Sequence, residues 1–578
     1  MQSRDEVMGR LARGEGDGRV LIIGGGINGI GVFRDLAAQG IPAVLVERGD
    51  FASGTSSAPS RLIHGGLRYL ETGEFALVRE SVEERNRLLL NAPHIVRPIP
   101  VWVPALSWTG GLIDAGLRFL KLKRTPGPKG ALAVRAGLVI FDHFGKLKRT
   151  MPRHRPVPIA AARKQIPFAA DVRAVLEYWD ARIHSPERLS LELVADAEAA
   201  CPDAFAAPYT EVTSMIDGAV ELLDRQTGRS TTIRPSLVVN CAGAWADRVD
   251  KRIGVPDRLI GGTRGSHLVL ERPDLAAELG DVMLYFETRD HRACLIFRLD
   301  ERMVLLGTTD LRVTNPDESM CTDAEIDYLF DVLTDLLPES APTRDQIRFV
   351  YSGVRPLPLS ADGATGAISR DHTFRVFEPA PGRPFRVVTL IGGKWTTYRA
   401  CAEQLTDKIL PMIDASRSAS TESLAIGGGH GFPRTPEGRA AAIADIAGKG
   451  RIAPEDAERL LDRYGSLGAE VAASFDAEGR RPLAGAPAYH AGEITWITTR
   501  ERVTRLEDIV LRRTLMAFEG HTSAATICDC AEIAATLLGW NPERKEAEIA
   551  ATLDLLASRH RVPTQPQTEI RHVASAQA

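Results

Sequence analysis

The feature that most constrains this chain is a glycine-rich segment near its N-terminus, RVLIIGGGINGIGVFRDLAAQGIPAVLVERGD at residues 19–50. Residues 20–23 are a short apolar run, which is typical of a buried parallel strand. The pattern G-x-G-x-x-G follows, then apolar residues at helical spacing, then a second apolar run, 43–46, that ends at Glu47. A lone G-x-G-x-x-G is weak evidence, but this order of strand, turn, helix, strand and acid predicts a βαβ unit that binds a dinucleotide.

Each glycine of this turn has a physical role in the predicted site. Gly24 makes the tight turn, Gly26 lets a pyrophosphate approach the backbone, and Gly29 lets the helix pack on the strand. The N–H groups at the start of the helix would bind the phosphates, and Glu47 would accept hydrogen bonds from the ribose hydroxyls. We expect Asn28, in the same turn, to contact the cofactor as well.

Two later segments indicate that the dinucleotide is a flavin. Residues 235–249 and 385–405 each read as an apolar strand, a turn of small residues and a helix. A helix N-terminus with Lys394 beside it would stabilise negative charge on a reduced flavin ring. Ordinary strand-to-helix turns are the alternative interpretation. The small residues of these turns that we expect to contact the cofactor are Ala242, Gly243 and Gly393.

The stretch SSAPSRLIHGGLRYLETGEF, residues 56–75, places cations and two glycines soon after the nucleotide signature. Paired glycines allow a flavin ring to approach the backbone closely. Arg68 and Tyr69 come just after them, where a substrate would meet the ring. A solvated polar loop with structural arginine pairs is the alternative. The residues of this stretch that we expect to contact the cofactor are Ser56, Ser57, Gly65 and Gly66.

Composition excludes several other classes of protein. The net charge is only −4, so no whole-molecule field favours nucleic acid. The seven cysteines are scattered without a C-x-x-C pair, which argues against a zinc site or a disulfide framework and fits a reducing compartment. The polar N-terminus is not a secretory signal, and no run of 18 apolar residues exists, so we expect a cytoplasmic protein with no metal site.

One segment is strongly basic. Residues 118–155 contain eleven lysines and arginines and one acid, Asp142, just after a partial apolar stripe at 112–120. A basic amphipathic segment suits an anionic bilayer, where each cation near the surface contributes about 1 kcal/mol. An anion funnel toward a phosphate site and a solvated basic face are the alternatives.

Four motifs carry a resemblance to a known family: IIGGGINGIGVFRDLAAQG, GTSSAPSRLIHGGLRYLETGEFALVRES, YSGVRPL and IGGKWTTYR. They resemble the FAD-dependent glycerol-3-phosphate dehydrogenases, the membrane-associated kind that passes electrons to quinone. The resemblance covers about residues 19–410. A weaker match, TRERVTRLEDIVLRRT at 499–514, resembles the helical C-terminal domain of that family.

The resemblance implies an α/β fold with three parts. These are a glutathione-reductase-like FAD-binding domain, a mixed α+β substrate domain with a sheet over the flavin, and an all-α C-terminal domain. Helical spacing of alanine, leucine and charged residues independently favours helices in the last third of the chain. We expect the FAD-binding domain at 19–110, 185–265 and 345–410, the substrate domain at 111–184 and 266–344, the helical domain at 420–560, and flexible tails at 1–18 and 562–578.

The expected reaction is the oxidation of sn-glycerol 3-phosphate to dihydroxyacetone phosphate. Guanidinium groups suit the phosphate oxygens, and a base must remove the hydroxyl proton. His267 is the first candidate base because imidazole titrates near neutral pH, while substrate hydrogen bonding and simple packing stay open for it. The resemblance implies the catalytic residues His267, Arg355, Lys394 and Arg68, and the substrate-binding residues Arg68, Tyr69, Thr309, Arg355 and Arg370.

The electron acceptor and the exact substrate are left open by the residues alone. No second complete βαβ fingerprint exists for a nicotinamide cofactor, so the family implies quinone at the inner face of the cell membrane, with oxygen as the runner-up. The alternatives are a dehydrogenase of a related polyol phosphate such as erythritol phosphate, and a non-catalytic flavoprotein. A homodimer contact and a lid are alternative roles for the C-terminal domain.

Some residues depart from the usual wording of the family motifs. Arg61 and Arg264 stand where lysine is usual, and Pro59 and Trp395 also differ. We expect these four residues to surround the substrate cavity, where they would bear on the identity of the polyol phosphate.

Overall fold

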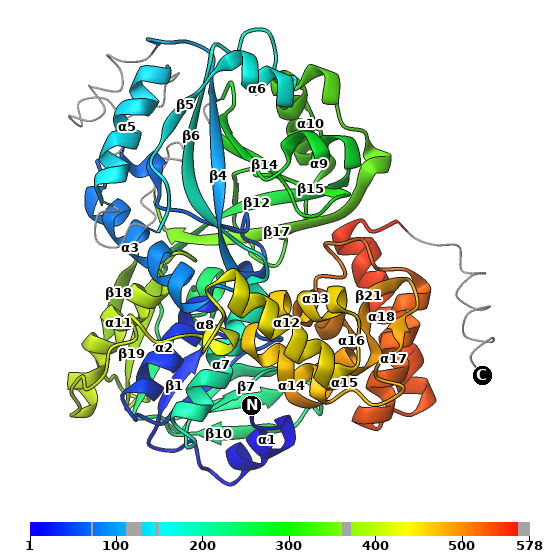
Figure 1. Cartoon of the computed structure of the whole chain (residues 1–578). Helices are drawn as coiled ribbons and strands as arrows, with labels where there is room; N and C mark the ends of the chain where they lie inside the picture. The colour runs from blue at the N-terminus through cyan, green and yellow to red at the C-terminus, as the bar shows by residue number, and fades with distance from the viewer. Residues whose placement is uncertain (71–72, 111–129, 145–149, 291, 361–370, 564–578) are drawn as a thin grey trace.

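The computed structural model describes residues 1–70, 73–110, 130–144, 150–290, 292–360 and 371–563, of which the Arg68 side chain is not described. Within these residues the chain forms a six-stranded sheet, a ten-stranded sheet, a three-stranded sheet and a two-stranded hairpin. Figure 1 shows the ten-stranded sheet in the upper part of the molecule, the six-stranded sheet in the lower part, and a helical C-terminal domain beside the lower part.

The six-stranded sheet, called the parallel sheet below, contains the predicted βαβ unit. Its order is β18-β19-β11-β1-β2-β7, and only the edge strand β18 runs antiparallel to its neighbour. Every residue of β1 and β2 is buried, as expected for strands covered on both faces. The bounds are β1 Val20–Ile23, β2 Ala43–Val46, β7 Phe205–Ala207, β11 Leu237–Asn240, β18 Thr373–Phe377 and β19 Arg386–Ile391.

Different layers cover the two faces of the parallel sheet. Val20 and Ile22 face a core shared with α2 Ile27–Ala38, α7 Pro186–Ala200 and α11 Tyr398–Ile409. Leu21 and Ile23, which alternate with them, pack under the three-stranded sheet and the N-terminal helix. Those elements are α1 Arg4–Ala12, β8 Thr210–Ile216, β9 Ala219–Asp224 and β10 Ser230–Ile233.

The ten-stranded sheet, called the large sheet below, arches over one end of the parallel sheet (Figure 1). Its main path is β16-β12-β15-β14-β13-β4-β6-β3, with β17 paired to β12 and β5 to β6. The bounds are β3 Leu62–Ile63, β4 Val96–Ala105, β5 Arg155–Val157, β6 Ala174–Ile183, β12 Ile260–Glu271, β13 Met283–Glu287, β14 Ala293–Arg298, β15 Met303–Gly307, β16 Leu311–Val313 and β17 Ile347–Pro358.

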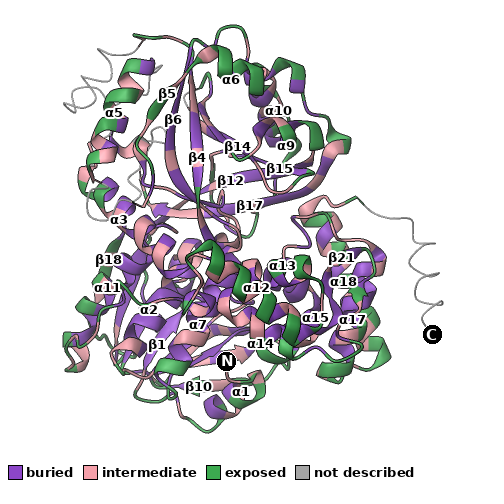
Figure 2. Ribbon diagram, in the orientation of Figure 1, coloured by how far each residue is buried: buried purple, intermediate pink, exposed green. Residues whose placement is uncertain are grey.

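Helices flank the large sheet and build the C-terminal domain. Figure 2 shows their buried faces turned toward the sheets and toward one another. The helices around the large sheet and the cofactor strands are α3 Phe75–Asn91, α5 Ala131–Phe144, α6 Ile159–Gln165, α8 Ala246–Arg252, α9 Pro273–Leu279 and α10 Asp323–Leu336. The C-terminal helices are α12 Pro436–Gly450, α13 Pro454–Tyr464, α14 Gly468–Ala473, α15 Ala491–Arg500, α16 Leu506–Asp508, the π-helix η10 Ile509–Arg513, α17 Ala524–Leu538 and α18 Pro542–His560.

The predicted fold class is confirmed, with three corrections to its details. The C-terminal domain also carries a short hairpin, β20 Pro482–Leu483 and β21 Ala486–His490. β4 and β17 belong to the large sheet, although we expected both in the FAD-binding domain, because apolar alternation does not reveal which sheet a strand joins. Residues 1–18 are not a flexible tail, since α1 buries Val7 and Leu11 against the parallel sheet.

Two expectations concern segments that the structure describes only in part. Of the predicted C-terminal tail, residues 564–578 lie outside the described residues. Of the basic segment 118–155, residues 118–129 and 145–149 lie outside them, so only α5 and the residues after 149 can be placed. In the part of the chain that is described, no helix is long and apolar enough to cross a membrane.

Candidate active site

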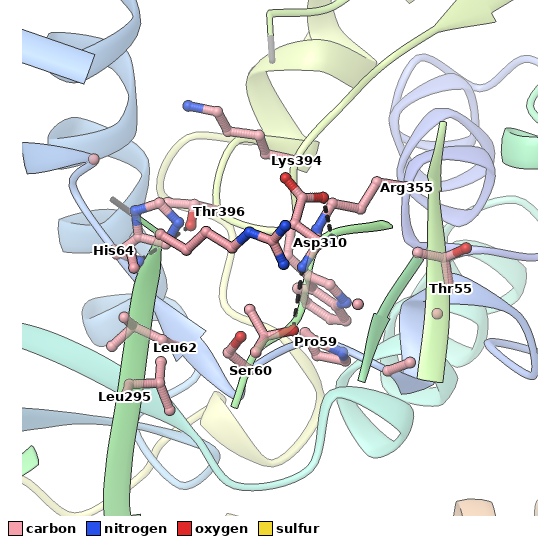
Figure 3. Close-up of a pocket in the computed structure, with 18 of the residues that line it drawn as sticks. Thr55, Pro59, Ser60, Leu62, His64, Leu295, Asp310, Arg355, Lys394 and Thr396 are labelled. Carbon is pink, nitrogen blue, oxygen red and sulfur yellow. Dashed lines mark hydrogen bonds and ion pairs between the residues drawn. The ribbon is translucent and has the colours of Figure 1, made fainter. Parts of the chain in front are cut away.

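A cavity of about 700 Å³ lies where the large sheet meets the carboxyl ends of the parallel strands. Its lining comes from β12, β17, the segment 55–69 and the turn 392–396, which are far apart in the sequence. Figure 3 shows Arg355 and Asp310 beside each other in this cavity, with Ser60 and Pro59 on another side of it. The carboxyl ends of parallel strands are where ligands bind in open α/β sheets.

The glycine turn has the geometry that its sequence predicts. Gly24 adopts a φ of +111°, and a Cβ there would lie 2.6 Å from the carbonyl oxygen of Cys241. A Cβ on Gly29 would overlap the carbonyl oxygen of Gly24. Both positions therefore require glycine for the helix α2 to start directly against β1 and β11.

Glu47 ends β2 with its carboxylate turned to the glycine turn. Oε2 accepts from the Gly25 N–H at 2.7 Å and Oε1 from the Gly49 N–H at 2.8 Å. Burial raises the pKa of Glu47 and outweighs these two N–H groups and Arg48, which lower it. Each carboxylate oxygen keeps a second lone pair, so the acid is oriented to accept from a ribose hydroxyl.

Other predicted cofactor residues gather around the same turn. The Ser56 hydroxyl accepts from the Ile27 N–H at 2.9 Å, at the N-terminus of α2 where a phosphate would lie. The Asn28 side chain touches Gly393, whose Cβ would lie 2.6 Å from Nδ2, and its buried Oδ1 has no hydrogen-bond partner among the described residues. Gly243 has a φ of +58° with open space where a Cβ would be.

These observations are what a long dinucleotide requires. A buried acceptor without a partner and a glycine facing open space leave room and hydrogen-bonding capacity for a ligand. We call the expected path of the cofactor, from the glycine turn, Glu47 and Ser56 past Asn28 to Gly393, the FAD groove; Gly393 touches Asn28 and also lines the cavity. The residues therefore fit FAD.

Two predicted cofactor residues, Ser57 and Gly65, have other roles in the structure. Ser57 is half-buried and donates to the carbonyl oxygen of Gly54 at 2.9 Å. A Cβ on Gly65 would overlap the ring of Phe141 in α5, so packing accounts for this glycine. Gly66 has a φ of +77° and lines the cavity, and the Ala242 N–H bonds to Asn240 at 3.0 Å.

His267 lies in β12 with its ring 4.7 Å from the ring of Tyr351 in β17, and the two rings are stacked with an interplanar angle of 8°. Its Nε2 is 2.8 Å from the Ser60 hydroxyl, while its buried Nδ1 has no hydrogen-bond partner among the described residues. The Tyr351 hydroxyl donates to the carbonyl oxygen of Pro59 at 2.9 Å, which fixes the loop that carries Ser60. Burial, followed by Arg355 and Arg61, lowers the pKa of His267 to about 3.

The lowered pKa of His267 predicts a pH dependence of stability. Between the usual value of about 6.5 and the folded value of about 3, the unfolded chain binds a proton that the folded chain excludes. Stability is therefore lost as pH falls through this window, by at most about 1.4 kcal/mol per pH unit for this group. We expect His267→Gln to remove the contribution of His267 to the slope of the unfolding free energy against pH. The free energy is measured by urea unfolding from pH 6 to pH 4.5.

Other buried histidines make the comparison with this variant necessary. The pKa of His560 is also lowered, to about 4, mainly by burial, so the wild-type slope alone does not report His267. Equal slopes for the wild type and His267→Gln would show that His267 is protonated in the folded protein.

Arg355 lies in β17 next to β12, and its guanidinium reaches into the cavity. Nη1 forms an ion pair with Asp310 at 3.1 Å, and Nη2 donates to the Thr308 hydroxyl at 3.3 Å. A Cβ on Gly265 would overlap Nη2, so glycine at this position of β12 lets the arginine lie across the strand. The partners of Arg355 fix its planar fork in one orientation.

The other predicted substrate and catalytic residues are only partly brought together. Lys394 lies 3.8 Å above the Tyr69 ring and 3.4 Å from the Ser81 hydroxyl, and Figure 3 shows it extending away from Ser60. Thr309 lines the cavity, but its hydroxyl donates to the buried Glu325 at 2.7 Å. The side chain of Arg68 and the whole of Arg370 lie outside the described residues.

Sequence reasoning missed several side chains of the cavity. Ser60 stands inside a quoted motif, and Tyr351 opens the motif YSGVRPL, so both could have been proposed from the resemblance. Asp310 carries no local signal, because its role depends on meeting Arg355 of β17 from the connection between β15 and β16. Further charged residues that line the cavity are Asp180, Asp290, Arg292 and Arg312.

Two of the four residues that differ from the family motifs do not line the cavity. Arg61 is buried against Glu187 at 3.3 Å and 3.7 Å from the Phe518 ring. Arg264 forms an ion pair with Glu325 at 2.6 Å. Arg61 is buried and Arg264 half-buried, and both are held by long-range partners that the sequence does not reveal, whereas Pro59 and Trp395 do line the cavity.

Comparisons with known proteins agree with this geometry. Residues 19–408 match the family described as FAD dependent oxidoreductase, and residues 419–545 match the family described as C-terminal domain of alpha-glycerophosphate oxidase. A glycerol-3-phosphate dehydrogenase of Synechocystis sp. is 31% identical over 559 residues, which cover 92% of this chain and 94% of the relative.

Two further similarities bear on the substrate and on the fold. A D-erythritol 1-phosphate dehydrogenase of Brucella abortus is 31% identical over 504 residues, covering 86% of this chain and 93% of the relative. The solved structure of a glycerol-3-phosphate dehydrogenase from Bacillus halodurans, complexed with FAD, superposes with a TM-score of 0.72. It covers 96% of this chain and 97% of its own at 23% identity, which supports the same fold.

Proposed function

Because the chain belongs to the family of FAD-dependent glycerol-3-phosphate dehydrogenases, we propose that it oxidises sn-glycerol 3-phosphate to dihydroxyacetone phosphate. One observation carries the proposal beyond the family. His267 and Arg355, from the paired strands β12 and β17, line a single cavity at the end of the FAD groove. A base and a guanidinium beside a flavin are what oxidation of a phosphorylated alcohol requires.

FAD, when bound, would accept the two electrons that leave the carbinol carbon of the substrate. Arg355 binds an anionic oxygen of the substrate, because its fork is already oriented by Asp310 and Thr308. Its position near His267 favours the oxygen of the reacting alcohol, whose negative charge grows during the reaction. Arg68 and Arg370 are proposed to bind the phosphate.

His267 is proposed to accept the hydroxyl proton at Nε2, the atom that the Ser60 hydroxyl orients. The low pKa keeps the ring neutral, and therefore able to accept a proton, at neutral pH. A phosphate dianion in the cavity would raise this pKa, because a nearby negative charge favours the imidazolium. Substrate binding thus increases the basicity of His267 when it is needed.

A four-carbon polyol phosphate is the second candidate substrate. The Brucella relative is named for D-erythritol 1-phosphate and has the same 31% identity as the Synechocystis relative, over a somewhat shorter match. Turnover with an artificial dye acceptor, compared for three-, four- and five-carbon polyol phosphates and for glycerol, separates the two. The highest kcat/KM with glycerol 3-phosphate supports the first, and no turnover with any of them rejects both.

We further propose that quinone reoxidises the flavin at the inner face of the cell membrane. The described part of the basic segment supports this. Helix α5 exposes Leu132 and Val139, and Leu106 and Trp108 are exposed in the segment that precedes the basic segment in the sequence. Apolar side chains beside a basic segment are typical of proteins that lie on an anionic bilayer.

Vesicle flotation tests the membrane proposal. We expect the protein to float with vesicles of anionic lipid, and Trp108→Ser with Leu132→Ser to reduce the bound fraction about tenfold or more, because two large apolar groups leave the bilayer. The matched control is Leu537→Ser, which changes an exposed leucine of α17 in the C-terminal domain. Equal flotation of all three proteins, or none at low salt, would contradict the proposal.

A further inference from the structure

Two arginines of the C-terminal domain reach the loop that follows the ribose-binding acid. This loop, residues 48–54, connects β2 to the short helix η1 Thr55–Ser57. Arg513 holds the Asp50 carboxylate with both ends of its fork, at 2.6 and 2.9 Å, and Arg512 Nε donates to it at 2.7 Å. Asp50 and Arg513 have no exposed side-chain surface.

The same loop is bonded to the cofactor turn on both sides of Asp50. The Gly49 N–H donates to Glu47, and the Ala52 N–H donates to the carbonyl oxygen of Gly25 at 2.8 Å. Gly25 in turn donates to Glu47. Asp50 is therefore the point at which a closed set of hydrogen bonds around Glu47 is attached to another domain.

Close packing makes the loop and the turn move together. A Cβ on Gly25 would lie 2.7 Å from Cβ of Glu47 and 3.1 Å from the ring of Phe51. Interiors packed at this density transmit a displacement instead of absorbing it. A shift of Asp50 would therefore move the carboxylate of Glu47 relative to the glycine turn.

The acidic and basic side chains around Asp50 compensate one another's charge as one connected group. Although burial raises it, Arg513 and Arg512 hold the pKa of Asp50 below its usual value. Arg512 also reaches Asp508 and Glu507. Removing one charge from such a buried set leaves the remaining ones uncompensated, so the loop would be displaced.

We propose that Asp50, held by Arg512 and Arg513, is a positioning residue for FAD, which makes the C-terminal domain a working part of the cofactor site. The effect passes through Gly49, whose N–H donates to Glu47, the acid expected to bind the ribose. The proposal rests on FAD being the cofactor and is independent of which alcohol is oxidised.

The test compares two matched variants by FAD affinity. Asp50→Asn neutralises the acid at the cofactor loop. Glu198→Gln neutralises an equally buried acid of α7 that holds Arg502 of the C-terminal domain at 2.6 Å, and whose other bonds go to Ala206 and Gln2. FAD is titrated onto each full-length apoprotein by quenching of flavin fluorescence, and thermal unfolding is recorded for each apoprotein.

We expect Asp50→Asn to weaken FAD binding about 10–100-fold. This range is usual for residues that orient a ligand-binding side chain without touching the ligand themselves. Glu198→Gln should change FAD affinity less than about threefold. It should lower the unfolding temperature of the apoprotein by about as much as Asp50→Asn does. An unchanged affinity in Asp50→Asn, or an equal loss in both variants, would overturn the proposal.

A second pair keeps the test decisive if Asp50→Asn does not fold. Arg513→Lys keeps the positive charge but loses the fork, and Arg502→Lys makes the same change at the control contact. We expect weaker FAD binding only in Arg513→Lys. Equal affinities in these two variants would equally reject the role of Asp50.

Discussion

Replacing Gly29 with alanine will give a protein that retains little or no FAD. The added Cβ would overlap the carbonyl oxygen of Gly24, which is backbone and has no rotamer by which to yield. Either α2 tilts away from β1 or the turn opens, and in both cases the N–H groups at the helix start leave the pyrophosphate. We expect FAD affinity to fall by about 5- to 150-fold, since overpacking a core contact costs about 1–3 kcal/mol and about 1.4 kcal/mol is tenfold in affinity. The measurement is the FAD-to-protein ratio after gel filtration.

Gly40→Ala is the matched control for this change. Gly40 lies at the other end of α2 with a φ of +73° and open space around the position of a Cβ. Alanine there costs about 1–2 kcal/mol in backbone strain and touches nothing in the groove. A normal FAD content in Gly29→Ala, or an equal loss in Gly40→Ala, would contradict the assignment of the turn.

Replacing Arg355 with methionine will lower kcat/KM about 10²–10³-fold with FAD fully bound. Methionine fills a similar volume but cannot donate to a developing negative charge, and loss of one such donor typically has this effect. Asp310 would also lose its ion pair inside the cavity and repel an anionic substrate. Turnover with a dye acceptor and the visible flavin spectrum measure the two quantities separately.

Arg348→Met separates this effect from damage to the strand. Arg348 lies in the same strand β17 and forms an ion pair with Glu271 at 2.6 Å, outside the cavity lining. We expect its kcat/KM to stay within about twofold of the wild type, as is usual for surface ion pairs. If Arg355→Met retains more than a tenth of the activity, Arg355 does not stabilise the reacting oxygen.

The cofactor groove could be predicted from the sequence because its information is local. Gly24, Gly29 and Glu47 stand within one βαβ unit, where spacing alone states the turn, the helix packing and the position of the acid. The structure gives each of them the geometry that the spacing predicted. The short segments at 242–243 and 393–394 were found for the same reason, as turns between an apolar strand and a helix.

The cavity could be predicted only in part, because its contacts depend on strand register. The stack of His267 on Tyr351 exists because β12 and β17 pair these two residues directly. No local pattern indicates that pairing, nor that Lys394 lies over Tyr69 and that the Thr309 hydroxyl binds Glu325. Sheet membership is equally non-local, which is why β4 and β17 were expected in the wrong domain.

The contact between Asp50 and Arg513 lies furthest from prediction, since the two residues are 463 positions apart. The sequence around Arg512 and Arg513 is typical of a solvated charged helix, and nothing in it indicates that the two arginines are buried. In the fold, both arginines are buried against Asp50 and so contact the loop that follows Glu47. The role that we propose for the C-terminal domain therefore could not be indicated by helical spacing alone.

The central claim is that FAD lies beside a cavity in which Arg355 binds and His267 deprotonates a phosphorylated alcohol, whose electrons pass to FAD. Anaerobic addition of glycerol 3-phosphate to the FAD-loaded protein, followed by visible absorbance, tests it most directly. Our account predicts that the flavin band bleaches with glycerol 3-phosphate or a close polyol phosphate and persists with unphosphorylated glycerol. A band that persists with every polyol phosphate, in protein that holds its full complement of FAD, would contradict it.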